Sequence, residues 1–167
     1  STYGEMTDFE TISPQFAHWS SEGDEFWYPV NLSAVSYGPE NSTSGDFAAG
    51  TNGTLLPGSS GYIRSEFWLL PAVVRYFNLS FDRWNSLDSG DTAGVQYSID
   101  NGTNWQILDN WTGNTTTWTQ ETYSLDLLVQ NATNIGFRFY VSKLNTSAAT
   151  EGLFIDSFNL SNQGDPQ

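Results

Sequence analysis

The sequence predicts an all-β protein, an antiparallel β-sandwich that forms a single domain over residues 1–167. Three observations predict this fold. Short aromatic and β-branched runs alternate between apolar and polar residues, and turns rich in Gly, Asn and Ser separate them. No segment has the 3.6-residue period of an amphipathic helix. Roughly nine to eleven short strands at intervals of about 8 to 20 residues are typical of a sandwich or barrel.

The clearest strand pattern lies at residues 76–84. Its apolar face contains Phe77, Leu79 and Phe81, and its polar face contains Tyr76, Asn78, Ser80 and Asp82. Because successive side chains of a strand point to opposite faces, this run is expected to form one wall of the sandwich, with Phe77, Leu79 and Phe81 inside.

A β-hairpin is expected at residues 95–108. Val95, Tyr97 and Ile99 repeat the period of two, and the sequence Asp100-Asn101-Gly102 follows. Asn and Gly tolerate positive φ, so we expect a two-residue primed turn before the chain returns.

The remaining strands are less regular. We expect strands at residues 7–10, 16–19, 26–30, 47–49, 62–70, 118–125, 135–141 and 153–160, an acidic turn at 21–25, and a single helical turn within 125–130. Residues 1–7 are polar, and the segment 1–9 is expected to be extended. It is predicted to add as a strand to the sheet of a neighbouring subunit.

The charge of the chain excludes several classes of partner. The sequence has 19 acidic and 5 basic residues, for a formal net charge of −14. Nucleic acid and anionic lipid surfaces would be repelled. No apolar run approaches the roughly 20 residues that a membrane span needs, so membrane insertion is not expected. The sequence contains no cysteine, which excludes disulfides and thiolate metal sites.

Asn-x-Ser/Thr sequons are unusually frequent. Ten are present, whereas the Ser and Thr content predicts about three by chance. They begin at Asn31, Asn41, Asn52, Asn78, Asn101, Asn110, Asn114, Asn131, Asn145 and Asn159. We therefore expect N-linked glycans and an extracellular or cell-surface location, although enrichment of Asn, Ser and Thr in β turns is an alternative explanation.

The order of several short motifs resembles a known family. These motifs are Asp8-Phe9-Glu10, Ser44-Gly45-Asp46-Phe47, the run 79–84, the hairpin 95–105, the run 135–139 and the closing Gly152-Leu153-Phe154-Ile155-Asp156. Together they resemble MAM-type jelly rolls and the related β-sandwich domains of immune inhibitor A-like metallopeptidases. Two features depart from this pattern: cysteines are absent, and Ser157 stands where a second acidic residue is typical.

The resemblance implies a calcium site. In such jelly rolls the first and last strands lie side by side, and similarity to calcium-binding members implies a structural Ca²⁺ between them. Its ligands would be Asp8, Glu10 and Asp156, with Asp46 as a fourth, because carboxylate oxygens suit this ion. Solvated surface carboxylates are the alternative. A second cation site is conceivable in the loop with Asp88 and Asp91.

The seven tryptophans suggest a sugar-binding surface, because aromatic faces stack on pyranose rings. Trp19, Trp27, Trp68 and Trp84 lie in strand-like aromatic runs and are expected in the core. Trp111 and Trp118 flank a polar loop and are the expected exposed, ligand-binding pair. No catalytic set is recognisable: the single histidine, His18, has no second His and no Cys to act with, so no enzyme activity is expected.

These observations leave three functions from different classes. The favoured one is a structural subunit of an extracellular filament, surface layer or adhesive coat, in which copies of the chain contact one another. The first alternative is a carbohydrate-binding module or lectin-like adhesin. The second alternative is an accessory domain of a secreted peptidase.

Overall fold

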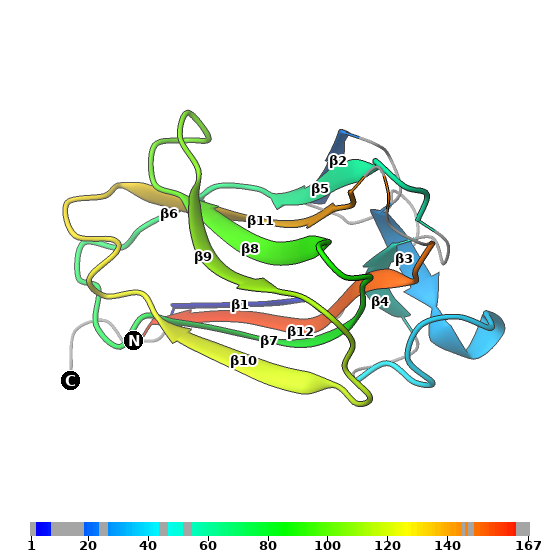
Figure 1. Ribbon diagram of the computed structural model, residues 1–167. Coiled ribbons are helices and arrows are strands. Elements are labelled where there is room, and N and C mark those ends of the chain that lie inside the picture. The colour runs from blue at the N-terminus through cyan, green and yellow to red at the C-terminus, as the bar shows by residue number, and fades with distance from the viewer. Residues whose placement is uncertain are drawn as a thin grey trace.

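The structure is a computed structural model that describes residues 3–7, 19–23, 27–43, 47–51, 55–144, 146 and 149–162. In this part of the chain, twelve strands and one short 3-10 helix are present (Figure 1). The strands form two antiparallel sheets that pack face to face, so the predicted all-β jelly-roll sandwich is confirmed. No helix of the described part has the length and hydropathy that a membrane span requires.

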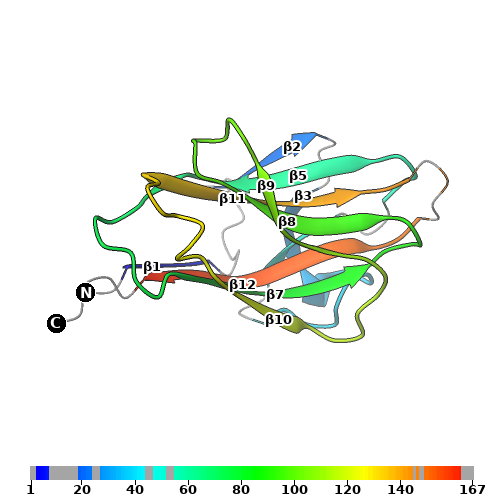
Figure 2. The same cartoon turned by 60° about the vertical axis from the view of Figure 1, so that its left-hand side comes forward.

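The first sheet has the strand order β10-β7-β12-β4-β3. Its strands are β10 (Thr119–Ser124), β7 (Asn78–Ser86), β12 (Gly152–Asn162), β4 (Phe47–Thr51) and β3 (Trp27–Asn31), and the 3-10 helix η1 (Leu32–Ala34) follows β3. β12 is central and long, and it pairs with β7 along one side (Figure 2). Along its other side, β12 pairs with β4 through its first half and with β1 (Tyr3–Thr7) through its second half.

The second sheet has the strand order β2-β5-β11-β8-β9. Its strands are β2 (Trp19–Gly23), β5 (Ser60–Ser65), β11 (Asn134–Ser142), β8 (Thr92–Ser98) and β9 (Gln106–Trp111), with the short β6 (Trp68–Leu69) also paired to β11. β11 lies between β5 and β8, and its side chains alternate between the core and the outer face.

Aromatic residues fill the space between the sheets. Phe77, Leu79 and Phe81 of β7 are buried as their alternation predicts. They face Phe137 and Phe139 of β11, and the rings of Phe81 and Phe139 meet edge to face at 5.0 Å. Such edge-to-face pairs add about 0.5–1.5 kcal/mol each beyond the area that they bury.

β12 is buried on both faces, which the sequence left open. Ile155 points into the main core, whereas Phe154 points to the outer face of the first sheet and is also fully buried. There, Phe154 packs with Val30, Leu32 and Ala48 in a second apolar cluster. A stretch from Tyr37 to Thr43 therefore lies over the outside of this sheet, with Pro39 buried and Glu40, Asn41 and Thr43 exposed.

Three sequence expectations were wrong in detail. The strand expected at 62–70 is divided into β5 and β6. Ser21, Glu22 and Gly23, expected in a turn, belong to β2 and pair with β5. The hairpin between β8 and β9 is confirmed, but its connection is longer than two residues, because strand pairing ends at Tyr97 and Gln106. Asn101 and Gly102 do have the expected positive φ.

The first strand pairs within its own chain. Tyr3 to Thr7 lie antiparallel to Asn162 to Phe158, so the first and last strands are side by side as the resemblance implied. The predicted donation of residues 1–9 to a neighbouring subunit is not tested by a single chain. It stays a prediction and would require this internal pairing to be exchanged.

Candidate functional site

A pocket of about 230 Å³ opens on the outer face of the first sheet, beside the second apolar cluster. Its lining residues are Pro39, Glu40, Asn41, Ser42, Trp84, Thr116, Thr117 and Trp118. Two tryptophans and one proline thus supply apolar walls, and short polar side chains and one carboxylate supply hydrogen-bonding groups. Small-molecule sites typically combine apolar walls with a few placed polar groups.

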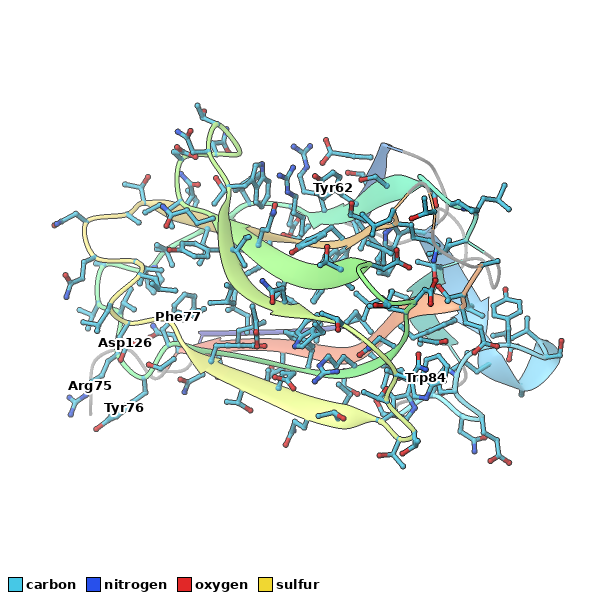
Figure 3. The ribbon with its side chains drawn as sticks, viewed as in Figure 1. Tyr62, Arg75, Tyr76, Phe77, Trp84 and Asp126 are labelled. Atoms are coloured by element: carbon cyan, nitrogen blue, oxygen red, sulfur yellow. The ribbon has the colours of Figure 1, made fainter. Side chains whose placement is uncertain are left out.

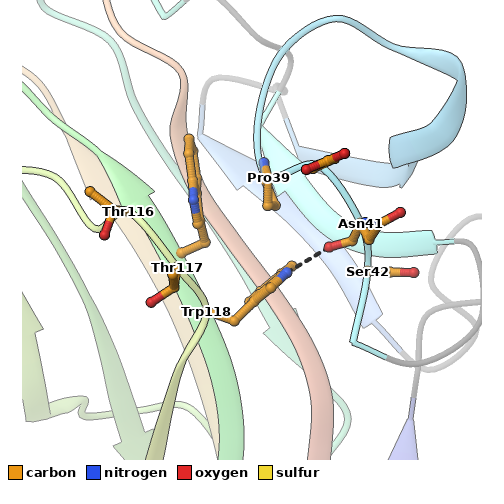
Figure 4. A pocket seen from close by; sticks show the side chains of 8 residues that line it. Pro39, Asn41, Ser42, Thr116, Thr117 and Trp118 are labelled. Atoms are coloured by element: carbon orange, nitrogen blue, oxygen red, sulfur yellow. Dashed lines mark hydrogen bonds between the residues drawn. The ribbon is translucent and has the colours of Figure 1, made fainter.

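Trp84 and Trp118 reach the pocket from neighbouring strands. Trp84 lies on β7 and meets Phe154 edge to face, with ring centroids 5.5 Å apart. Trp118 directly precedes β10, and its Nε1 donates a hydrogen bond of 2.6 Å to the carbonyl oxygen of Asn41 (Figure 4). Because this bond uses the single hydrogen-bond donor of the indole, Trp118 is held in one orientation beside the loop that carries Asn41.

The first wall of the pocket, residues 39–42, is tied to the sheet by Asp156. The carboxylate of Asp156 is fully buried on β12, and its Oδ2 accepts hydrogen bonds from the backbone N of Thr43 at 2.8 Å and from Thr43 Oγ1 at 3.2 Å. Its Oδ1 accepts from the backbone N of Ser157. Ser157 has a φ of 54° at the point where the β12 register shifts, so a bulge aims Asp156 at the loop.

The second wall, residues 116–118, is tied to the sheet by Asn85. The buried side chain of Asn85 donates from Nδ2 to the carbonyl oxygen of Gly113 at 2.7 Å. Its backbone carbonyl accepts from the backbone N of Thr115 at 2.8 Å. Buried polar side chains therefore hold the loops on both sides of the pocket, and a ligand would find the site already formed.

Trp118 is the one predicted ligand-binding residue that lines this pocket. Its predicted partner, Trp111, is 8% exposed and packs in the main core against Phe81, with ring centroids 5.9 Å apart, so its predicted exposure was wrong. Trp84, predicted in the core, lines the pocket instead. Figure 3 places Trp84 at the end of the sandwich opposite to Tyr76.

A signal for Trp84 was present in the sequence. In the run 76–84 the even-numbered residues point away from the core, and this period places position 84 on the outer face. Trp19, Trp27 and Trp68 are buried as predicted. Trp111 could not be placed in this way, because the register between β8 and β9 shifts after Val95.

The predicted calcium ligands are only partly covered. Asp8, Glu10 and Asp46 lie outside the described residues, and Asp156 binds the Thr43 backbone. Within the described ranges, no group of three His, Asp or Glu side chains is placed to hold a metal ion. Calcium binding therefore stays a prediction, and the described geometry supports a loop-anchoring role for Asp156.

In the loop with Asp88 and Asp91, where the sequence suggested a second cation site, Asp91 is paired with a lysine of the same chain. Asp91 accepts a 2.7 Å hydrogen bond from the ammonium of Lys143, and both side chains are fully buried. The positive charge beside this loop is thus supplied by the chain itself.

The sequons lie at accessible positions wherever the structure describes them. Five of their asparagines are exposed: Asn41, Asn101, Asn110, Asn114 and Asn131. Three are partly exposed: Asn31, Asn78 and Asn159. Asn52 and Asn145 lie outside the described residues. Accessibility permits glycosylation but does not test it, so the glycans stay a prediction.

At the level of sequence, the chain is similar to a small part of one known protein. The sequence matches no known protein-family profile. It is 26% identical over 167 residues to bacillopeptidase F of Bacillus subtilis (strain 168), an alignment that covers 97% of this chain and 11% of that protein. The chain therefore spans about a tenth of the length of the curated relative that it matches.

Solved structures share the fold at low sequence identity. TmCBM61, a carbohydrate-binding module solved with β-1,4-galactotriose, has a TM-score of 0.62 at 19% identity, over 93% of this chain and 94% of that one. The K2 adhesin domain of Lys-gingipain has a TM-score of 0.64 at 14% identity, over 95% and 99%. The CBM22-2 xylan-binding domain of Paenibacillus barcinonensis Xyn10C has a TM-score of 0.52 at 13% identity, over 95% and 99%. These likenesses establish the sandwich fold.

Proposed function

We propose that this chain is a non-catalytic carbohydrate-binding domain that acts outside the cell, and that the pocket between Trp84 and Trp118 holds the sugar. The observation that carries the proposal is the pairing of two tryptophans with short polar side chains in a preformed hollow. An indole face offers apolar area to the C–H face of a pyranose ring, and Asn41, Ser42 and Thr116 offer partners to its hydroxyls.

The size and charge of the pocket limit the kind of sugar that it can bind. Its volume of about 230 Å³ is below the roughly 300–1,000 Å³ of typical small-molecule sites. We infer that it takes one sugar ring, as a terminal residue or a single unit of a chain. Its one charged lining residue is Glu40, a carboxylate, so a neutral sugar fits the site better than an acidic one.

The comparisons support this proposal over a filament or surface-layer subunit. Solved neighbours include carbohydrate-binding modules and an adhesin domain, which correspond to the first alternative drawn from the sequence. The match to a small part of bacillopeptidase F favours a role as an accessory domain of a larger secreted protein, in which sugar binding would hold the parent chain at a surface. Self-assembly has no comparable support.

The test is sugar binding by protein produced without N-glycans, because a glycan on Asn41 would stand at the pocket. A panel of neutral oligosaccharides identifies the tightest ligand, and calorimetry then compares the wild type with Trp118→Ala. We expect the variant to bind at least about tenfold more weakly, which corresponds to about 1.4 kcal/mol.

Tyr76→Ala is the matched control for loss of an aromatic ring. Tyr76 is 54% exposed at the opposite end of the sandwich, and its removal should leave the affinity unchanged (Figure 3). Equal affinity of Trp118→Ala and the wild type would contradict the proposed pocket. Absence of binding to every neutral sugar would contradict the proposed function.

A further inference from the structure

The outer face of the second sheet carries a cluster of aromatic and basic side chains. In the strand register, Arg138 of β11 lies between Arg64 of β5 and Gln96 of β8. Two residues further along, Tyr140 of β11 lies beside Tyr62 of β5. These residues alternate with buried core residues, so their side chains lie on the side away from the first sheet.

Arg138 is held between two aromatic rings. Its Cζ is 4.1 Å from the ring centroid of Tyr62 and 4.4 Å from that of Trp105, which comes from the loop after β8. Its Nε donates a 2.6 Å hydrogen bond to Oε1 of Gln96. The plane of the guanidinium is thus fixed on both faces and at one edge, a geometry in which Arg recognises flat anionic groups well.

The other edge of this guanidinium has no partner within the part of the chain that the structure describes. Only Nε of Arg138 makes a hydrogen bond there, which leaves the donors on Nη1 and Nη2 for a ligand. An Arg fork of this kind pairs with a carboxylate through two parallel hydrogen bonds.

A second arginine increases the positive charge at this place. Arg64 lies directly opposite Arg138 in the β5–β11 register, and like charges so placed repel. The nearest carboxylate oxygen, Oε1 of Glu22, is 3.8 Å from Nε of Arg64, too far for a hydrogen bond. Two of the five basic residues of a chain with a net charge of −14 therefore share one small area. Burial is the main cause that lowers the pKa of Arg138; Tyr62 and Glu22 act against it, and Arg64 acts in the same direction as burial.

We propose that Arg138 and Arg64, with the rings of Tyr62, Tyr140 and Trp105, form a second binding site that takes an acidic saccharide. The carboxylate of a uronic acid residue would pair with the guanidinium groups, and its ring would lie against the aromatic side chains. The strong negative charge of the whole chain disfavours densely charged polyanions, whereas a uronic acid carries only one carboxylate per ring. This site shares no residue with the Trp84–Trp118 pocket, so the two proposals can fail separately.

The test compares an acidic oligosaccharide with its neutral counterpart. Trigalacturonate and its methyl ester are titrated into glycan-free protein by calorimetry at low and at moderate salt. We expect trigalacturonate to bind with an affinity that falls as salt rises, and we expect the ester to bind at least about tenfold more weakly. Equal binding of the two would overturn the proposal, and so would equally tight binding of an acidic peptide such as triglutamate.

Variants then assign the site. Arg138→Gln should abolish binding of trigalacturonate, and Arg138→Lys, which keeps the charge but loses the planar fork, should weaken it about tenfold or more. Should Arg138→Gln fail to fold, Arg64→Gln provides the same readout, since the Arg64 side chain is 37% exposed and makes only long contacts. Tyr76→Ala, which removes an exposed ring that belongs to neither site, should bind trigalacturonate as the wild type does. Unchanged binding by the arginine variants would overturn the assignment.

Discussion

Lys143 and Asp91 form an ion pair that is fully buried between the end of β11 and the start of β8. The Nζ of Lys143 also donates to Oγ1 of Thr150 at 2.8 Å, and Oδ1 of Asp91 accepts from the backbone N of Leu144 at 2.9 Å. Both charges are therefore hydrogen-bonded in several directions. A buried pair of this kind adds little net stability, but loss of one partner leaves an uncompensated charge in the core.

The first prediction concerns this ion pair. Lys143→Met should lower the free energy of unfolding by about 3–5 kcal/mol, because Asp91 would remain buried and unpaired. Urea denaturation measures the change. The double variant Asp91→Asn with Lys143→Met removes both charges and keeps an acceptor for the Leu144 amide, so it should be more stable than the single variant. A single variant within 1 kcal/mol of the wild type would contradict this account.

Tyr123 is a second residue whose environment gives a testable pH dependence. The single proton of its hydroxyl is shared between Oδ2 of Asp109, at 2.7 Å, and Oε2 of Glu121, at 3.2 Å. Burial is the largest cause that raises the pKa of Tyr123 far above its ordinary value, and the hydrogen bond to Asp109 is the next. The folded protein therefore keeps this proton at a pH where the unfolded chain loses it.

Because of this difference in pKa, the free energy of unfolding decreases at high pH. The stabilising contribution is complete below the unfolded pKa of about 10 and is lost progressively as the pH rises above it. We expect the free energy of unfolding to fall between about pH 9.5 and 11. Tyr123→Phe should make this fall shallower in urea melts. An identical slope in the two proteins would contradict the role of Tyr123.

At the scale of secondary-structure elements, the bulge in β12 links the centre of the first sheet to the pocket. Asp156 and Thr43 are far apart in the sequence, and their hydrogen bonds fasten the loop 36–43 to β12. This loop contributes Pro39, Asn41 and other lining residues. We therefore treat Asp156 as a positioning residue that acts on the proposed sugar site through the loop.

The prediction for this element is that Asp156→Asn loosens the loop. An amide cannot accept on both of its groups, so one bond to the backbone N of Thr43 or of Ser157 would be lost. We expect faster hydrogen exchange at whichever of these two amides loses its acceptor, and a stability loss of about 1–3 kcal/mol. Sugar affinity should fall although Asp156 does not line the pocket. Unchanged exchange at the amides of both Thr43 and Ser157 would contradict this role of Asp156.

Local sequence pattern predicted some features of these elements and could not predict others. Alternation in the run 76–84 predicted the buried face of β7 correctly, and extended by one step it places Trp84 on the outer face. The burial of Asp156 and the core position of Trp111 depend on a loop packed from a distant part of the chain and on a shifted register. Local pattern carries no information on such long-range pairing. For this reason only Trp118 of the predicted pair lines the pocket.

At the scale of the whole molecule, two candidate binding surfaces lie on the outer faces of the two opposite sheets. The Trp84–Trp118 pocket is on the first sheet and has a carboxylate at its lining, which suits a neutral sugar. The Arg138 cluster is on the second sheet and has two guanidinium groups, which suits an acidic one. The sandwich between them separates the two sites, so a single domain could contact two sugars on different polymers.

The central claim is tested most directly by the indole resonances of the seven tryptophans in an ¹H–¹⁵N spectrum. On titration with the neutral oligosaccharide that binds most tightly, we expect the Nε1 signals of Trp84 and Trp118 to shift in a saturable way. The signals of the buried Trp19, Trp27 and Trp68 should stay in place. Saturation of the protein with sugar while the Trp84 and Trp118 signals remain unmoved would contradict the account.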